Sequence, residues 1–208
     1  MANWCYNRIA FYQDSPQENG GNALIEAFYA DIQKYTSYVD TDGRKSDWLG
    51  NWLVANKIDV KSMRCRGSFI DCELYDDHVI ATIETAWNPL PEVFGAIAAK
   101  YDLSYVYTSE ECGREIYVNT DEFGRFFSTR YMLNAYDIED LELDVDAEIM
   151  RRFGERLKEI VSDSKYFDSF DEVLYEFKGF GVDDVSDVEE LNQRLEPLNI
   201  KVYEYSSE

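Results

Sequence analysis

The first residues of the chain alternate between apolar and polar positions. Between residues 3 and 12, Cys5 and Phe11 fall on one face, while mainly aromatic and basic side chains fall on the other. A period of two residues predicts a β-strand. Asn7 shares the face of Cys5, where a buried amide must be hydrogen bonded. We therefore interpret the opening "NWCYN" as a structural strand in which Cys5 and Asn7 point inward and Trp4 packs on the opposite face.

Beyond a break rich in Pro and Gly, the apolar spacing becomes helical. The stripe that recurs every three to four residues is formed by Leu24, Ile25, Phe28, Ile32 and Tyr35. The pattern then predicts a short helix, a hairpin of two strands, another helix and three strands, at residues 47–57, 63–75, 78–87, 91–101, 103–109, 114–119 and 125–132. The main order is β-α-β-β-α-β, which predicts an α+β fold with a ferredoxin-like split βαβ antiparallel sheet, extra strands, and helices on one face.

The composition changes in the last part of the chain. Residues 135–208 carry 22 acidic and 8 basic residues, so most of the net charge lies there. Apolar periodicity at residues 149–161 and Ser-x-x-Glu capping boxes beginning at Ser169 and Ser186 predict helices. We therefore expect a ferredoxin-like α+β domain at residues 1–134 and an acidic, mainly helical C-terminal region at residues 135–208.

The formal net charge of −22 narrows the choice of partners. Such a surface repels nucleic acid phosphates and anionic membranes, and it attracts basic proteins. The sequence has no stretch of 18 apolar residues and no basic leader followed by an apolar segment. We therefore expect a cytoplasmic protein that contacts neither nucleic acid nor a membrane directly and keeps its four cysteines as reduced thiols.

Residues that could carry catalysis or bind a metal are few. Cys65 and Cys72 lack the paired spacing of a zinc site, and His78 is the only histidine. The hairpin could bring Cys72 near His78, which leaves one nucleophilic arrangement open. No phosphate-binding or dinucleotide-binding glycine loop occurs, and "DTDG" lacks the carboxylates that a calcium loop needs at positions 38 and 49. The prediction is no enzyme, no metal and no cofactor.

Two acidic stretches, at residues 137–148 and 183–190, are candidates for a partner-binding surface. Acids at the start of a helix favour its positive dipole end, so solvated helix starts are one interpretation. An ordered array of carboxylates can also approach the charge density of duplex DNA, which carries about one charge per 1.7 Å of its axis. In that interpretation the partner-binding residues are Asp137, Glu139, Asp140, Glu142, Asp144, Asp146, Asp183, Asp184, Asp187, Glu189 and Glu190.

Three segments match the motifs of one known family: the opening "NWCYN", "TAWNPLPEVFGAIAAKYDLSYVY" and "GREIYVNTDEFGRFF". Asn3, Trp4, Cys5 and Asn7 match its Asn-Trp-Cys-x-Asn strand start. The chain resembles the YubB-type ferredoxin-like proteins, an uncharacterised family of phages, plasmids and conjugative elements, over about residues 3–132. The resemblance implies a ferredoxin-like fold and a mobile-element origin in a bacterial host cell, and it transfers no catalytic residues.

The resemblance and the charge together predict a non-catalytic accessory protein of a mobile element. Its partner would be a basic protein, and the specific case is a host-defence enzyme inhibited by acidic DNA mimicry, in an anti-restriction or anti-CRISPR role. The alternative is a ferredoxin-like module that binds a ligand or RNA on the open face of its sheet. A small enzyme built around His78 is the third hypothesis. The partner's identity and any homo-oligomer stay open.

Overall fold

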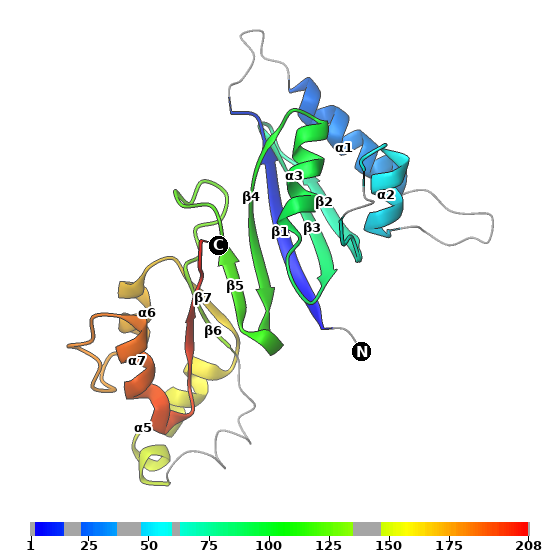
Figure 1. Ribbon diagram of the computed structural model, residues 1–208. Helices are drawn as coiled ribbons and strands as arrows, with labels where there is room; N and C mark the ends of the chain where they lie inside the picture. The colour runs from blue at the N-terminus through cyan, green and yellow to red at the C-terminus, as the bar shows by residue number, and fades with distance from the viewer. Residues whose placement is uncertain (1–2, 15–21, 37–46, 60–62, 135–146, 208) are drawn as a thin grey trace. The chain divides into compact units, whose positions relative to one another are not determined.

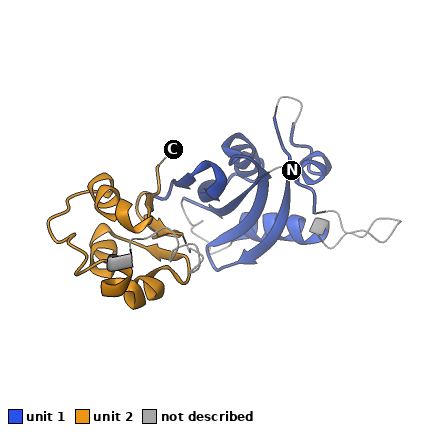
Figure 2. Cartoon of the chain, turned by 90° about the horizontal axis from the view of Figure 1, so that it is seen from below, with its two compact units in different colours: residues 1–121, 208 blue, residues 122–207 orange. Residues whose placement is uncertain are grey.

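The computed structural model describes residues 3–14, 22–36, 47–59, 63–134 and 147–207. The chain divides into two compact units, residues 1–121 with residue 208, and residues 122–207 (Figure 2). Both units combine helices with antiparallel strands, so the α+β class is confirmed (Figure 1). Among the described helices, none has the length and apolar character that crossing a membrane requires.

The first unit is built on a five-stranded antiparallel sheet with the strand order β2-β3-β1-β4-β5. Its strands are β1 Trp4–Tyr12, β2 Gly67–Leu74, β3 His78–Ala86, β4 Ser104–Glu111 and β5 Ile116–Asn119. The central strand β1 pairs with β3 on one side and with β4 on the other along most of its length. The opening "NWCYN" therefore pairs with β3 from Trp4 onward and has strand neighbours on both sides from Tyr6 onward.

Three helices pack on one face of this sheet (Figure 1). They are α1 Ala23–Thr36, α2 Leu49–Ala55 and α3 Pro91–Lys100, and the short 3-10 helix η1 Cys112–Arg114 follows β4. The predicted stripe of α1 is confirmed, because Ile25, Phe28 and Ile32 are fully buried. Pro91 occupies the first turn of α3, where its fixed φ and missing N–H are tolerated.

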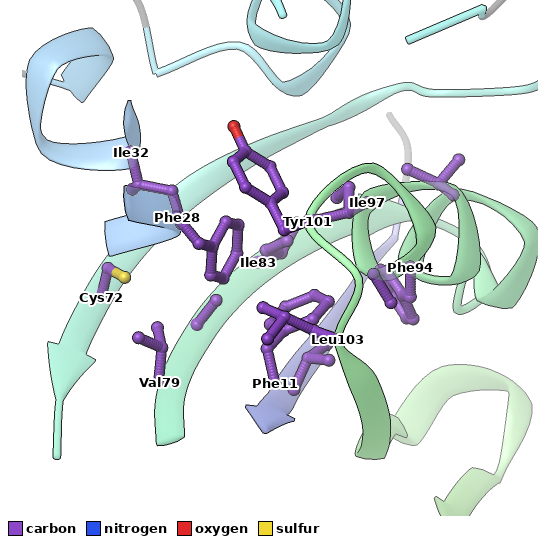
Figure 3. Packing of buried hydrophobic residues seen from close by; sticks show 14 of the residues in the cluster. Phe11, Phe28, Ile32, Cys72, Val79, Ile83, Phe94, Ile97, Tyr101 and Leu103 are labelled. Carbon is purple, nitrogen blue, oxygen red and sulfur yellow. The ribbon is translucent and has the colours of Figure 1, made fainter. Parts of the chain in front are cut away.

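The core between the helices and the sheet is rich in aromatic rings (Figure 3). Phe28 of α1 meets Phe11 of β1 edge to face, with ring centroids 4.8 Å apart, and Tyr101 at 5.0 Å. Trp52 of α2 lies 5.4 Å from Phe69 of β2. Buried rings of this size dominate packing energetics, so these contacts tie α1 and α2 to the sheet.

The second unit contains a three-stranded antiparallel sheet with the order β7-β6-β8. Its strands are β6 Tyr131–Leu133, β7 Lys165–Phe167 and β8 Val202–Glu204. The described helices are α5 Ala147–Val161, α6 Phe170–Glu176, α7 Val188–Leu195 and the 3-10 helix η2 Glu196–Leu198. A separate apolar core, which includes Leu157, Phe177 and Leu191, joins these helices to the sheet.

One strand lies in a different sheet from the one that the sequence pattern suggests. Periodicity predicts a strand at residues 125–132 beside the first sheet. Residues 125–130 form no strand, and β6, which begins at Tyr131, pairs with β7 and β8. The compact units accordingly divide after Asp121, whereas the composition shift suggests a boundary after residue 134. A period of two identifies a strand but does not specify its partner, because pairing depends on segments distant in sequence.

Candidate functional site

The predicted acidic surface falls in two parts of the chain. Six of its carboxylates lie outside the described residues, namely Asp137, Glu139, Asp140, Glu142, Asp144 and Asp146. The other five stand on the approach to α7 and in its first turn, namely Asp183, Asp184, Asp187, Glu189 and Glu190. We use "α7 acidic surface" below for these five residues, which precede α7 or lie in its first turn.

Two of the five carboxylates cap the helix. Asp187 has an extended backbone, and its Oδ1 accepts a hydrogen bond from the N–H of Glu190 at 2.9 Å. Oε2 of Glu190 reaches back and accepts from the N–H of Ser186 at 3.1 Å. The sequence pattern predicts Ser186 as the cap, so that assignment is wrong by one residue. A carboxylate is an effective acceptor at the positive end of a helix, which favours Asp187.

A third feature of the surface is a cation that the sequence analysis missed. Arg194, one turn further along α7, lies 3.2 Å from Asp184 and 3.5 Å from Glu190. Its other terminal nitrogen donates to the carbonyl oxygen of Gly181 at 2.8 Å. The hydrogen bond from Arg194, followed by its charge, lowers the pKa of the Asp184 carboxyl. The i,i+4 spacing of Glu190 and Arg194 is the sequence signal that could have identified this pair.

The five carboxylates therefore differ in how they are held. Asp184, Asp187 and Glu190 have hydrogen-bonded partners that orient them, and all five are exposed except the half-buried Glu190. A guanidinium and two backbone N–H groups order Asp184, Asp187 and Glu190 without cancelling the charge of the set. The result is a negative surface of defined geometry at the start of α7.

An open groove of about 620 Å³ lies next to this surface, between α7 and β8. Its lining residues are Val188, Glu189, Asn192, Gln193, Glu196, Lys201 and Glu204. Asn192 fixes one wall, because its side chain accepts from Val202 N and donates to Val202 O, each at 2.8 Å. Three carboxylates and one ammonium make the groove acidic, and Glu189 belongs to both the groove and the α7 acidic surface.

The opening strand carries a buried polar cluster centred on Asn7. Both Cys5 and Asn7 are fully buried while Trp4 is 43% exposed, so the predicted orientation of "NWCYN" is confirmed. Nδ2 of Asn7 lies 2.9 Å from Cys5 O and 2.8 Å from Ile83 O. Ser109 Oγ donates to Asn7 Oδ1 at 2.7 Å. The amide thus satisfies groups on three adjacent strands, which is a structural role.

Burial also controls the thiols. Removal from water raises the pKa of Cys5 from its ordinary value of 9.0 to about 12. The same cause raises the pKa of Cys72 to about 12. A thiolate, not a thiol, is the nucleophile and metal ligand, so these two groups are unreactive at neutral pH. Cys112 is exposed and lies in η1.

The structure separates the two residues of the nucleophilic hypothesis. Cys72 pairs with Ala81 on the face covered by the helices, whereas His78 pairs with Tyr12 on the other face. The His78 ring is stacked on Tyr75, with centroids 4.5 Å apart. A Cys72–His78 arrangement is therefore excluded by the register. Within the described ranges, no group of three His, Cys, Asp or Glu side chains gathers in a way that could hold a metal ion.

A buried carboxylate lies near the same end of the sheet as the Asn7 cluster. Glu111 is 4% exposed, and its Oε1 accepts from the N–H of Gly113 at 3.0 Å. Its Oε2 is the single buried side-chain oxygen or nitrogen, among the described residues, without a hydrogen-bond partner. Such an atom costs roughly 1–3 kcal/mol of stability. Sequence analysis could not find it, because nothing near Glu111 marks it as different from the other 41 acids.

The described surface thus offers oriented carboxylates beside an acidic groove. The two buried thiols of the protein, Cys5 and Cys72, are protonated at neutral pH. This arrangement of carboxylates can bind cationic groups by charge and by hydrogen bonds. The chain was also compared with known proteins. No family model, no curated protein and no solved structure matches it.

Proposed function

We propose that this protein is a non-catalytic accessory protein that binds a basic protein partner through its acidic surface. The observation that supports it most is the α7 acidic surface, where Arg194 and two backbone N–H groups orient three carboxylates beside the exposed Asp183 and Glu189. Oriented charges lose less conformational freedom on binding than mobile ones. A net charge of −22 adds long-range attraction for a cationic partner.

The proposed setting is a mobile genetic element in a bacterial host. It rests on the resemblance of about residues 3–132 to YubB-type proteins and on the charge. The corresponding partner is a nucleic-acid-processing defence enzyme, a restriction or CRISPR effector, whose basic cleft would accept the carboxylates in place of phosphates. We further propose that the first unit is a ferredoxin-like fold with β5 added at one edge. The element order β1-α1-α2-β2-β3-α3-β4, which is β-α-β-β-α-β with α2 added, and the strand order β4-β1-β3-β2 support it.

The test is binding to purified restriction and CRISPR effector nucleases at low and high salt. The variant Asp183→Asn with Glu189→Gln removes two charges and leaves the helix cap intact. We expect it to weaken binding roughly 3- to 10-fold, because exposed ion pairs contribute about 0.2–1 kcal/mol each. The matched control is Glu155→Gln with Glu159→Gln, which removes two exposed charges from α5. Affinity that is independent of ionic strength would eliminate the electrostatic mechanism.

One observation favours the alternative, a module that binds RNA on the open face of the first sheet. Trp4 and Tyr6 are 43% and 44% exposed there, and single-stranded nucleic acids stack on such rings. Glu84 and Glu110, however, lie directly opposite Tyr6 on the two neighbouring strands and repel phosphates. Fluorescence anisotropy with labelled single-stranded RNA distinguishes this alternative from the proposed function. Binding at about 150 mM salt, where phosphate repulsion still acts at short range, would favour the alternative.

A further inference from the structure

The face of the first sheet that the helices leave uncovered carries a tyrosine between two glutamates. In strand β1, Cys5 and Asn7 are fully buried, so Trp4 and Tyr6 point to the opposite face. Tyr6 is in register with Glu84 of β3 and with Glu110 of β4. Directly opposite side chains in antiparallel strands have Cβ atoms about 4.5–5.5 Å apart. Tyr6 therefore lies between two glutamates on this face of the sheet.

The neighbouring row adds one indole ring. Trp4 is in register with Ala86, whose small side chain leaves the indole 43% exposed.

An arginine of the chain itself packs over one of these rings. The guanidinium carbon of Arg66 lies 5.7 Å from the centroid of the Trp4 ring. A guanidinium within about 6 Å of an aromatic centroid makes a favourable cation–π contact. Tyr6 offers the same kind of ring beside the Glu84 carboxylate, which provides ion pairing in addition.

We propose that the surface formed by Trp4, Tyr6 and Glu84, which we call the β1 aromatic surface, is a docking site for an arginine side chain of a basic protein segment. This proposal rests on the proposed function and names a second contact for the same class of partner. The guanidinium stacks on Tyr6 and pairs with the Glu84 carboxylate. Arginine is preferred over lysine because its planar, weakly hydrated group stacks on a ring and binds a carboxylate through two N–H groups.

The probe is a fluorescein-labelled nonapeptide with four arginines separated by glycines, and its matched control has four lysines. Affinity is measured by anisotropy at about 150 mM salt, where long-range attraction to the whole protein is screened. Tyr6→Ala is expected to weaken the arginine peptide about 3- to 20-fold, because it removes the ring on which the guanidinium stacks. Tyr6→Phe keeps the ring and retains binding. Glu84→Gln weakens binding while keeping the side-chain shape, and it covers the case in which Tyr6→Ala fails to fold.

Two controls separate this proposal from the proposed function. Tyr175→Ala removes a 75% exposed tyrosine from the second unit and leaves peptide affinity unchanged. Asp183→Asn with Glu189→Gln weakens binding to the effector nucleases under the proposed function, but it does not alter the preference for arginine over lysine. If Tyr6→Ala and Glu84→Gln bind both peptides as the parent protein does, the β1 aromatic surface is not the docking site, whatever the α7 variants do. If only Asp183→Asn with Glu189→Gln loses nuclease binding, the proposed function stands and the proposal of an arginine docking site is overturned.

Discussion

The side-chain amide of Asn7 lies 3.0 Å from the hydroxyl of Thr85, two residues that are 78 positions apart in the chain. Thr85 in turn donates to the carbonyl oxygen of Asn88 at 2.6 Å, in the turn that leads into α3. Asn88 Oδ1 accepts from Arg114 at 2.8 Å, which lies beyond the end of β4. Asn7 is thus the buried end of a hydrogen-bonded path that joins the central strand to both neighbouring turns.

We expect Asn7→Ala to reduce the free energy of unfolding by about 3 kcal/mol. The substitution leaves the Ser109 hydroxyl and the Ile83 carbonyl oxygen without their buried partner, and each orphaned group costs about 1–3 kcal/mol. Urea unfolding followed by circular dichroism measures the change. The double variant Asn7→Ala with Ser109→Ala should recover part of the loss, because it removes one orphaned group. Equal stability of both variants would contradict this account of the cluster.

Cys5→Ala should lower stability by about 1 kcal/mol, because it removes one buried sulfur atom from a packed core. Binding to a basic partner should be unchanged, since the thiol makes only buried contacts. Thermal unfolding and partner affinity are measured on the same preparation. Loss of affinity at an unchanged melting temperature would show that "NWCYN" has a direct functional role. Cys112→Ala, at an exposed position, serves as the control.

The two buried thiols predict an alkaline limit of stability. Their pKa values rise from 9.0 in the ordinary state to about 12 on folding, because burial disfavours the thiolate. The unfolded chain therefore loses these protons first, so the stabilisation is complete below about pH 9 and is lost as the pH rises towards 12. Each thiol contributes at most about 1.4 kcal/mol per pH unit in this range.

The measurement compares urea midpoints at several alkaline pH values for the parent protein and for Cys5→Ala with Cys72→Ala. The variant should lose stability less steeply above about pH 9, because it lacks the two thiols. Tyrosines that also titrate in this range are common to both proteins, so the difference between the two curves reports the thiols. Parallel curves would mean that the two thiols do not titrate differently in the folded and unfolded states. At pH 8, a thiol reagent should modify the exposed Cys112 before Cys5 or Cys72.

Asp187→Ala should destabilise the second unit by about 1 kcal/mol, because it removes the side chain that accepts the N–H of Glu190 at the start of α7. Asp187→Asn keeps an acceptor and should cost a few tenths of this. Ser186→Ala should also have a small effect, since its backbone N–H, rather than its hydroxyl, makes the shorter bond to Glu190. Thermal unfolding of the three variants distinguishes them. A larger effect of Ser186→Ala than of Asp187→Ala would indicate that Ser186 is the N-cap, as the Ser-x-x-Glu pattern suggests.

Much of the local structure could be predicted from the spacing of apolar residues. The stripe through Phe28 and Ile32 and the alternation around Cys5 depend on neighbours within a few positions, so a helical or strand period is visible in the sequence itself. The N-cap at Ser169 was also visible, and its hydroxyl accepts from the N–H of Glu172. Net charge follows from composition alone, so the expectation of a basic partner needs only the sequence.

Only the tertiary structure decided which distant groups meet. The placement of Tyr131–Leu133 in the second sheet depends on strands that begin at Lys165 and Val202, far along the chain. The flanking of Tyr6 by Glu84 and Glu110 comes from the register of β1 with two other strands. A period in the sequence records the direction in which a side chain points, because that depends on the local backbone. Its partner depends on long-range packing, in which many segments of similar pattern compete, and that choice is made only when the whole chain folds.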